Sequence, residues 1–236
     1  MPLLIVPLAG PDFYSEKFGI RPLYPIGNLT LIETVFSSRP WISGNSLVSN
    51  QIVFVLRDEG PNTKIMQRFI KKKYPSAQTV LLSSYTVGAP LSALAGISIF
   101  TSHRSPVVID LADISFDMPQ DFNTYFFKHP NVDAIVPYFN SEDPKFSYLK
   151  LDGPNVIQAS EKQIISSNAS VGVYFFRDVV TYLKSIIFCL ENPKICKCGN
   201  SFYICPSLNG LIVEGRQVHA LEVKNVQPFS AMFRNS

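Results

Sequence analysis

The sequence predicts an α/β protein with a mostly parallel mixed sheet and helices on both of its faces. Short segments rich in β-branched and aliphatic residues recur between stretches of helical periodicity along the 236 residues. One of these segments, Pro106–Asp110, is an uninterrupted apolar run, as expected for a strand buried on both faces. Hydrophobic residues make up 46% and charged residues 17%, which suits a chain with a large core. We expect a single domain over residues 1–236.

The first half of the chain predicts alternating strands and helices. In one expected helix, Ile65, Met66, Phe69 and Ile70 follow helical spacing, and the lysines at 71–73 favour a helix C-terminus. The expected elements are a strand at Leu3–Leu8, a helix at Leu29–Ser38, a strand at Gln51–Leu56, a turn at Asp58–Asn62, a helix at Thr63–Tyr74, a strand at Gln78–Leu82, a helix at Leu91–Phe100 and the strand at Pro106–Asp110.

The second half predicts consecutive strands with few helices between Val132 and Phe176, which indicates an antiparallel edge or subdomain. The expected elements are strands at Ala134–Phe139, Tyr148–Leu151 and Val171–Phe176, a helix at Asp178–Leu190 and a late strand at Val218–Val223.

Composition excludes several classes of partner. With 21 Lys and Arg against 18 Asp and Glu, the net charge of +3 does not indicate a nucleic-acid partner. The segment Ala77–Ser102 has no charged residue, but turn-forming residues at 83–90 divide it, so we expect no membrane span. The apolar start of the chain is short, is broken by Pro7 and follows no basic residue. This favours a buried strand over a signal peptide, so we expect a cytoplasmic protein.

The cysteines and histidines predict no reactive centre. Four cysteines in 236 residues do not form a disulfide framework, and Cys196 and Cys198 are separated by one residue, unlike the usual zinc spacing. No Ser-His-Asp or Cys-His arrangement can be argued from the sequence.

Ligands of open α/β sheets bind outside the carboxyl ends of the strands, so residues that follow strands are candidates. Leu8, Ala9 and Gly10 end the first strand, where a small turn lets a ligand approach backbone amides. Arg21 follows on a proline-rich stretch and suits bidentate phosphate binding. The alternative is an ordinary turn with a surface arginine.

Two further strand ends carry candidates. Gly88 and Ala89 open a helix of small residues, where a flat ligand such as a nucleobase could lie against the backbone; the alternative is close packing of the helix. Asp113 follows the strand that ends at Asp110, and a carboxylate there can hold Mg²⁺; the alternative is a cap on the following turn.

Glu161 and Lys162 place an acceptor for hydroxyls beside a cation for a phosphate, which is a sugar-phosphate recognition pair. The alternative is a solvated ion pair on the surface.

Taken in order, these segments resemble the sugar-phosphate nucleotidyltransferases, from Leu4 to about Pro228. That family has a Leu-Ala-Gly strand end followed by Lys-Pro-Leu, matched here by residues 8–10 and 21–23, and a strand followed by a metal-binding Asp, matched by Val107–Asp117. The residues at 86–94 resemble its second nucleotide-contacting loop. A later block resembles one bacterial branch found with surface-polysaccharide genes: Asp143–Tyr148, Glu161–Lys162, Ser166–Tyr174 and Phe202–Pro206 with Asn209.

The resemblance implies a GT-A-like, Rossmann-like fold and a reaction between a nucleoside triphosphate and a sugar 1-phosphate that releases pyrophosphate. Arg21, Asp113 and Lys162 would be catalytic, with Mg²⁺ on Asp113 and, as a second ligand, Asn225. The implied substrate-binding residues are Leu8, Ala9, Gly10, Gly88, Ala89, Glu161, Gly172 and Asn209.

The phosphate loop departs from the family pattern. The second glycine and the arginine of its Gly-x-Gly-x-Arg motif are missing, Pro11 removes an amide donor, and Asp12 and Glu16 add negative charge. Two other hypotheses therefore stay open: a divergent GT-A glycosyltransferase or inactive protein that binds a nucleotide or nucleotide-sugar, and an interaction protein that keeps only the fold. The sugar, the base and the oligomeric state are not encoded in any motif.

Overall fold

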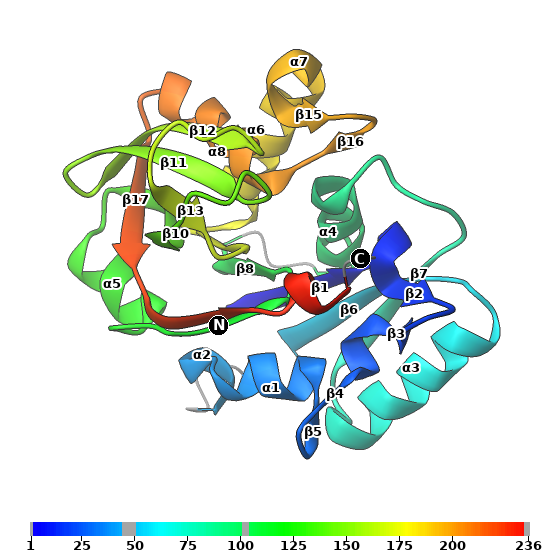
Figure 1. Ribbon diagram of the computed structural model, residues 1–236. Coiled ribbons are helices and arrows are strands. Elements are labelled where there is room, and N and C mark those ends of the chain that lie inside the picture. The colour runs from blue at the N-terminus through cyan, green and yellow to red at the C-terminus, as the bar shows by residue number, and fades with distance from the viewer. Residues whose placement is uncertain (1, 44–50, 101–103, 234–236) are drawn as a thin grey trace.

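A ten-stranded mixed sheet runs through the computed structural model, which describes residues 2–43, 51–100 and 104–233 (Figure 1). From one edge to the other, its strands are β7 (Gln78–Leu82), β6 (Ile52–Arg57), β1 (Leu3–Leu8), β8 (Val107–Asp110), β14 (Val173–Phe176), β10 (Val132–Asn140), β17 (Gln217–Glu222), β12 (Asn155–Glu161), β11 (Ser147–Asp152) and β13 (Asn168–Ser170).

The sheet has a parallel half and a largely antiparallel half. β7, β6, β1 and β8 run parallel, as expected, whereas β14 is antiparallel to both β8 and β10. β13 pairs with β10 as well as with β11, so five strands at this end close into a barrel-like ring. The expected antiparallel region after residue 132 is confirmed, but the sheet is not mostly parallel, because β14 lies antiparallel between β8 and β10 and the strands of the ring pair antiparallel except for β10 with β17.

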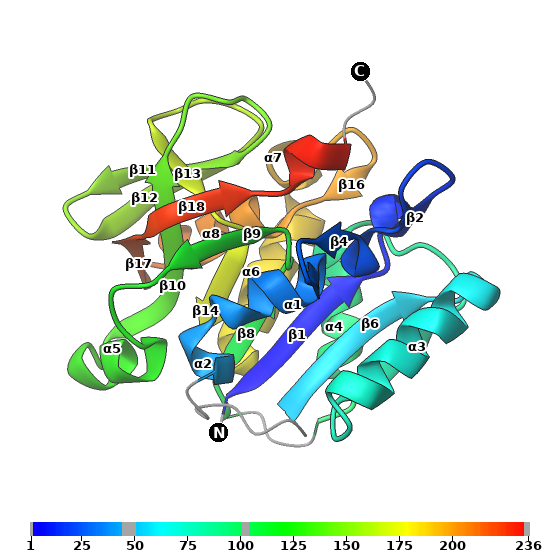
Figure 2. The same ribbon diagram turned by 60° about the horizontal axis from the view of Figure 1, so that its bottom comes forward.

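Helices cover both faces, as the sequence predicts (Figures 1 and 2). Alternate residues of each strand face opposite cores, so that Leu3 and Ile5 pack on one side and Leu4 and Val6 on the other. The first core lies under α4 (Ala89–Ile97), α6 (Val179–Glu191) and α8 (Ile204–Val213). The second lies under α1 (Leu31–Ser37), α2 (Pro40–Ser43), α3 (Pro61–Lys73) and α5 (Phe122–Lys128).

Short elements complete the chain. They are β2 (Tyr14–Ser15), β3 (Gly19–Ile20), β4 (Pro25–Ile26), β5 (Leu29–Thr30), β9 (Ile114–Asp117), α7 (Pro193–Cys196), β15 (Lys197–Cys198), β16 (Ser201–Phe202) and β18 (Lys224–Pro228), with 3₁₀ turns η1 (Pro11–Phe13), η2 (Arg21–Leu23) and η4 (Ser230–Phe233). None of the described helices is long and apolar enough to cross a membrane. Residues 101 and 102, which end the uncharged segment, lie outside the described residues.

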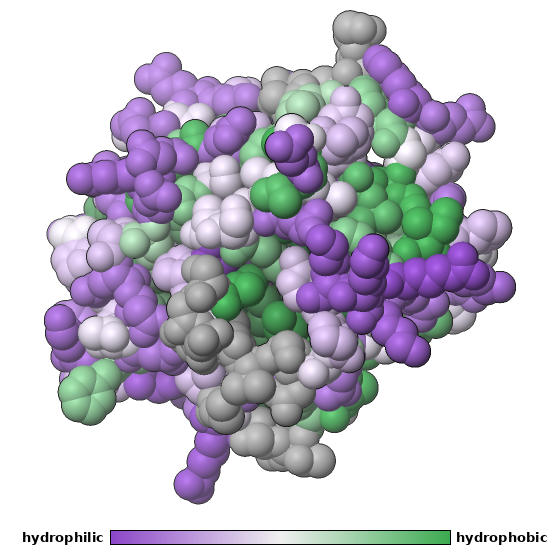
Figure 3. All heavy atoms as spheres, turned by 90° about the horizontal axis from the view of Figure 1, so that it is seen from below, coloured by the Kyte–Doolittle hydropathy of each residue, from purple (hydrophilic) through white to green (hydrophobic). Residues whose placement is uncertain are grey.

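Seen from below, the molecule presents mainly hydrophilic side chains toward its rim, with hydrophobic side chains gathered in smaller areas (Figure 3).

A buried ion pair fastens the second core to the end of β8. Arg39 and Asp110 are both fully buried, and Arg39 donates from Nε to Asp110 Oδ2 (2.7 Å) and from Nη2 to Asp110 Oδ1 (3.1 Å). Arg39 Nη2 also donates to the carbonyl of Ile114 (2.8 Å), and the Ala112 amide donates to Asp110 Oδ1 (2.9 Å). The pair thereby fixes the turn between β8 and β9, where Ala112 has a positive φ of 55°.

Removing either partner of this pair leaves an uncompensated buried charge. We expect Arg39→Met and Asp110→Leu each to lower the free energy of unfolding by about 3–5 kcal/mol, and the double variant Arg39→Met/Asp110→Leu to lose less than the sum of the two single losses. Urea denaturation measures this. Lys184→Gln, which breaks the exposed Lys184–Glu214 ion pair, is the control and should unfold like wild type. Single variants with the same free energy of unfolding as Lys184→Gln would contradict the stabilising role of the Arg39–Asp110 pair.

Candidate functional site

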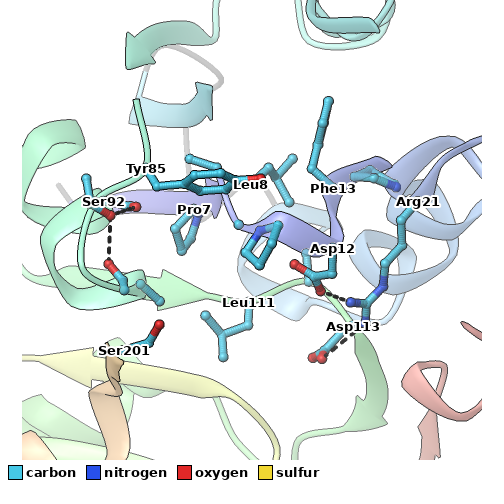
Figure 4. Close-up of a pocket in the computed structure, with 18 of the residues that line it drawn as sticks. Pro7, Leu8, Asp12, Phe13, Arg21, Tyr85, Ser92, Leu111, Asp113 and Ser201 are labelled. Atoms are coloured by element: carbon cyan, nitrogen blue, oxygen red, sulfur yellow. Dashed lines mark hydrogen bonds and ion pairs between the residues drawn. The ribbon is translucent and has the colours of Figure 1, made fainter. Parts of the chain in front are cut away.

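A cavity of about 570 Å³ opens at the carboxyl ends of β1, β7 and β8 (Figure 4). Its walls come from the turn after β1, the loop between β7 and α4, the β8–β9 turn and the segment before α8. The lining residues are Pro7–Phe13, Arg21, Pro22, Leu31, Tyr85, Thr86, Gly88, Ala89, Ser92, Leu111–Asp113 and Ser201–Tyr203. Seven predicted site residues therefore meet in one place: Leu8, Ala9, Gly10, Arg21, Gly88, Ala89 and Asp113.

Arg21 lies between two carboxylates at one end of this cavity (Figure 4). Its Nη1 forms a short ion pair with Asp12 Oδ2, and its Nη2 lies 3.6 Å from Asp113 Oδ2. The guanidinium also lies over the ring of Phe233, with 5.0 Å between Cζ and the ring centroid. These contacts hold Arg21 at the cavity wall, where its side chain keeps 16% of its exposure.

Asp113 projects from the left-handed turn that the Arg39–Asp110 pair fixes. Its carbonyl accepts a hydrogen bond from the Phe229 amide (2.9 Å), and its side chain keeps 29% exposure in the cavity. The surrounding protein raises the pKa of the Asp113 carboxyl to about 6 by burial, which the positive charge of Arg21 opposes and the negative charge of Asp12 reinforces.

Asp113 has the chemistry of a Mg²⁺ ligand. Gly172 lies beside it with a positive φ of 75°, and a Cβ at this glycine would stand 3.5 Å from Asp113 Oδ1, so the missing side chain leaves room there. The described part of the chain contains no group of three or more His, Cys, Asp and Glu residues suited to a metal. The Asp113 carboxylate is an oxygen ligand of the kind that Mg²⁺ prefers.

Gly88 touches the opposite wall through its backbone. It has a φ of 123° and pairs with Phe202 as an isolated bridge, and a Cβ at this position would lie 2.2 Å from the Phe202 carbonyl oxygen. Phe202 also donates its amide to the Val87 carbonyl (2.8 Å). Gly88 thus allows close packing of the backbone, and it packs against the segment before α8 rather than against the sheet.

Lys162 and Glu161 lie at the end of β12, next to the cavity rather than in its wall. Lys162 has a φ of 53° and donates from Nζ to the hydroxyl of Tyr203 (3.1 Å), which does line the cavity. Glu161 accepts a short hydrogen bond from Ser147, and burial raises the pKa of the Glu161 carboxyl to about 7 against the opposing effects of Ser147 and Lys162.

The structure does not bring Asn209 or Asn225 to the cavity. Asn209 accepts from the Ala159 amide (2.9 Å) and donates to the Ala159 carbonyl (2.8 Å), so its side chain fastens α8 to β12. Asn225 donates to Asp117 Oδ2 (2.6 Å) at the far end of the β9–β18 pair. The register of this pair places Phe229, not Asn225, beside Asp113, which corrects the expected second metal ligand.

Some cavity residues were not named as site residues, although the sequence segments that contain most of them were. Thr86 and Ser92, which share a hydrogen bond of 2.6 Å, lie in the 86–94 segment, and Tyr203 lies in the Phe202–Pro206 block. Tyr85 was missed: its ring lies under the Arg57 guanidinium, with 3.2 Å from Cζ to the ring centroid, and it follows the end of β7, so the rule that located Gly88 could have found it.

Comparison with known proteins shows the fold. A nucleoside-diphosphate-sugar pyrophosphorylase from Vibrio cholerae RC9 superposes with a TM-score of 0.79 at 19% identity, over 97% of this chain and 95% of that one. An inositol-1-phosphate CTP transferase from T. maritima gives 0.72 at 13% identity, over 96% and 87%. The chain shares the fold of these proteins. No family model and no curated protein sequence matches it.

The glycines at positions 88 and 10 should differ sharply when replaced by alanine. Gly88→Ala meets backbone atoms and a strained φ, so we expect a loss of about 2–4 kcal/mol in the free energy of unfolding. Gly10 has an ordinary φ of −74°, and a Cβ there meets the end of the Asp12 side chain, so Gly10→Ala should change stability by less than about 1 kcal/mol. Denaturant unfolding compares them; equal losses would contradict this reading of Gly88.

The raised pKa of Asp113 predicts a stability difference that depends on pH. The unfolded carboxyl titrates near 3.9 and the folded one near 6, so the folded protein binds the extra proton between these values. Wild type should therefore lose about 2–3 kcal/mol relative to Asp113→Asn as pH rises from about 4 through the folded pKa of about 6, and the change should be complete by about pH 7. Unfolding of both proteins across this range tests it, and parallel stability curves would disprove the shift.

Proposed function

We propose that the protein is a GT-A-like nucleotidyltransferase that joins a sugar 1-phosphate to a nucleoside triphosphate and releases pyrophosphate. The observation that carries the proposal is the convergence of the Leu8–Gly10 turn, Gly88, Arg21 and Asp113 on one cavity at the carboxyl edge of the sheet. The fold shared with proteins described as a pyrophosphorylase and a CTP transferase supports it.

In this reaction an oxygen of the sugar 1-phosphate bonds to the α-phosphorus, and the bond from that phosphorus to the oxygen shared with the β-phosphate breaks. Catalysis of such a transfer depends mainly on positioning and charge stabilisation. Backbone atoms at residues 8–10 and 88–89 would hold the nucleoside. Arg21 would take the negative charge that develops on pyrophosphate. A Mg²⁺ ion on Asp113, when bound, supplies further positive charge to the phosphate oxygens.

The sugar phosphate would enter from the side of β12. Lys162 points its ammonium at Tyr203 in the cavity wall, where it can meet a phosphate, and Glu161 beside it can accept from a sugar hydroxyl. The resemblance of the later block to the surface-polysaccharide branch supports a role in precursor synthesis in the cytoplasm.

A second candidate is a protein that binds a nucleotide or nucleotide-sugar without releasing pyrophosphate. The observation that favours it is the Asp12–Arg21 ion pair, because the cation expected to bind phosphate already has a carboxylate partner.

Turnover separates the two candidates. Purified protein with Mg²⁺ is incubated with each of the four nucleoside triphosphates and a panel of hexose 1-phosphates, and pyrophosphate release is measured. We expect one combination to react, Asp113→Asn to lower kcat by about 10²–10³-fold, and Lys162→Met to raise KM for the sugar phosphate. Asp152→Asn, at the exposed last residue of β11, is the matched control and should leave kcat unchanged.

If no combination releases pyrophosphate while a nucleotide-sugar raises the melting temperature of the protein, the second candidate replaces the first.

A further inference from the structure

We propose that Asp12 is a specificity-determining residue that competes with substrate phosphate for Arg21. The cavity then accepts a phosphate group only when the phosphate displaces the Asp12 carboxylate, so free polyphosphates bind weakly. The inference rests on the proposed function, since it requires phosphates to bind at this end of the cavity.

The Arg21 side chain is held by more contacts than the Asp12 side chain and is less exposed. Arg21 is held on three sides, by Asp12, Asp113 and the ring of Phe233, and its side chain is only 16% exposed. The Asp12 side chain is 65% exposed and extends from the η1 turn into the cavity mouth. Of the two, Asp12 is the partner that can move into solvent while the guanidinium stays at the wall.

The absence of a side chain at Gly10 leaves space for the Asp12 carboxylate. It lies against Gly10, and a Cβ on this glycine would stand 2.7 Å from Asp12 Oδ1. The absent side chain at position 10 therefore lets the carboxylate fold back toward Arg21. A carboxylate and a phosphate present the same kind of anionic oxygens to a guanidinium, so Asp12 occupies Arg21 as a phosphate would.

The charge of the cavity makes this competition consequential. Among the described residues that line it, the charged ones are Asp12, Arg21 and Asp113, which sum to −1. A triphosphate brings several negative charges to a wall whose one arginine is already neutralised. Converting Asp12 to a neutral side chain removes one of the two carboxylates beside that arginine and with it a repulsive charge.

The test uses inorganic pyrophosphate as the probe, with EDTA present to remove divalent ions. Isothermal titration calorimetry compares wild type with Asp12→Asn and Asp12→Ala, after circular dichroism confirms that each variant is folded. We expect about tenfold tighter binding in both Asp12 variants, the size of one modest ion pair. The matched control is Glu16→Gln, which removes an exposed charge from the same loop and should change affinity by less than about twofold. Adding Arg21→Ala to Asp12→Asn should abolish the gain.

An equal gain in Glu16→Gln, no gain in the Asp12 variants, or no detectable binding by any of the proteins at millimolar pyrophosphate would overturn the inference. Parallel titrations with the four nucleoside triphosphates separate it from the proposed function. Tighter pyrophosphate binding without binding of any nucleoside triphosphate would support the role of Asp12 and count against the transferase. Transferase turnover with unchanged pyrophosphate affinity would overturn the role of Asp12 alone.

Discussion

The buried Arg39–Asp110 ion pair is the interaction on which the cavity depends. The two buried charges are tolerated because both oxygens of the Asp110 carboxylate accept hydrogen bonds, from the Arg39 guanidinium and from the Ala112 amide. The third contact, from Arg39 to the Ile114 carbonyl, fixes the start of β9 as well. The turn between them is consequently held in a left-handed conformation, and this conformation directs Asp113 into the cavity.

The cavity is chemically divided, and the division gives a bound ligand its direction. Asp12, Arg21 and Asp113 gather at one end, while Tyr85 and Ser92 lie toward the other (Figure 4). The proposed nucleotide would have its phosphates facing Arg21 and its ring along the backbone of Gly88. In that arrangement Asp12 would act on the phosphates and not on the base.

The sequence predicted elements that are defined by neighbouring residues and missed those that depend on packing between distant segments. The buried strands β1, β6 and β8 were found because their apolar runs need no partner to be recognised, and the rule on strand ends then located Leu8–Gly10, Gly88 and Asp113. β12 alternates exposed and buried residues weakly, and α8 begins with Ile-Cys-Pro, so both were missed. Asn225 was misplaced because the register between β18 and β9 is set by distant packing, which no spacing along the chain reveals.

Residues 201–203 join the two halves of the molecule. Phe202 pairs with Gly88 beside the parallel half. The Tyr203 hydroxyl accepts a hydrogen bond from the Lys162 ammonium of the barrel-like half. Ser201 and Phe202 form β16 of the β15–β16 hairpin and Tyr203 links it to α8, and the buried Cys189 and Cys196 pack against Phe202. A shift of this segment would move the Gly88 wall and the Lys162 side together. In the proposed reaction, the distance between the nucleotide and the sugar phosphate would therefore depend on a segment that belongs to neither half of the sheet.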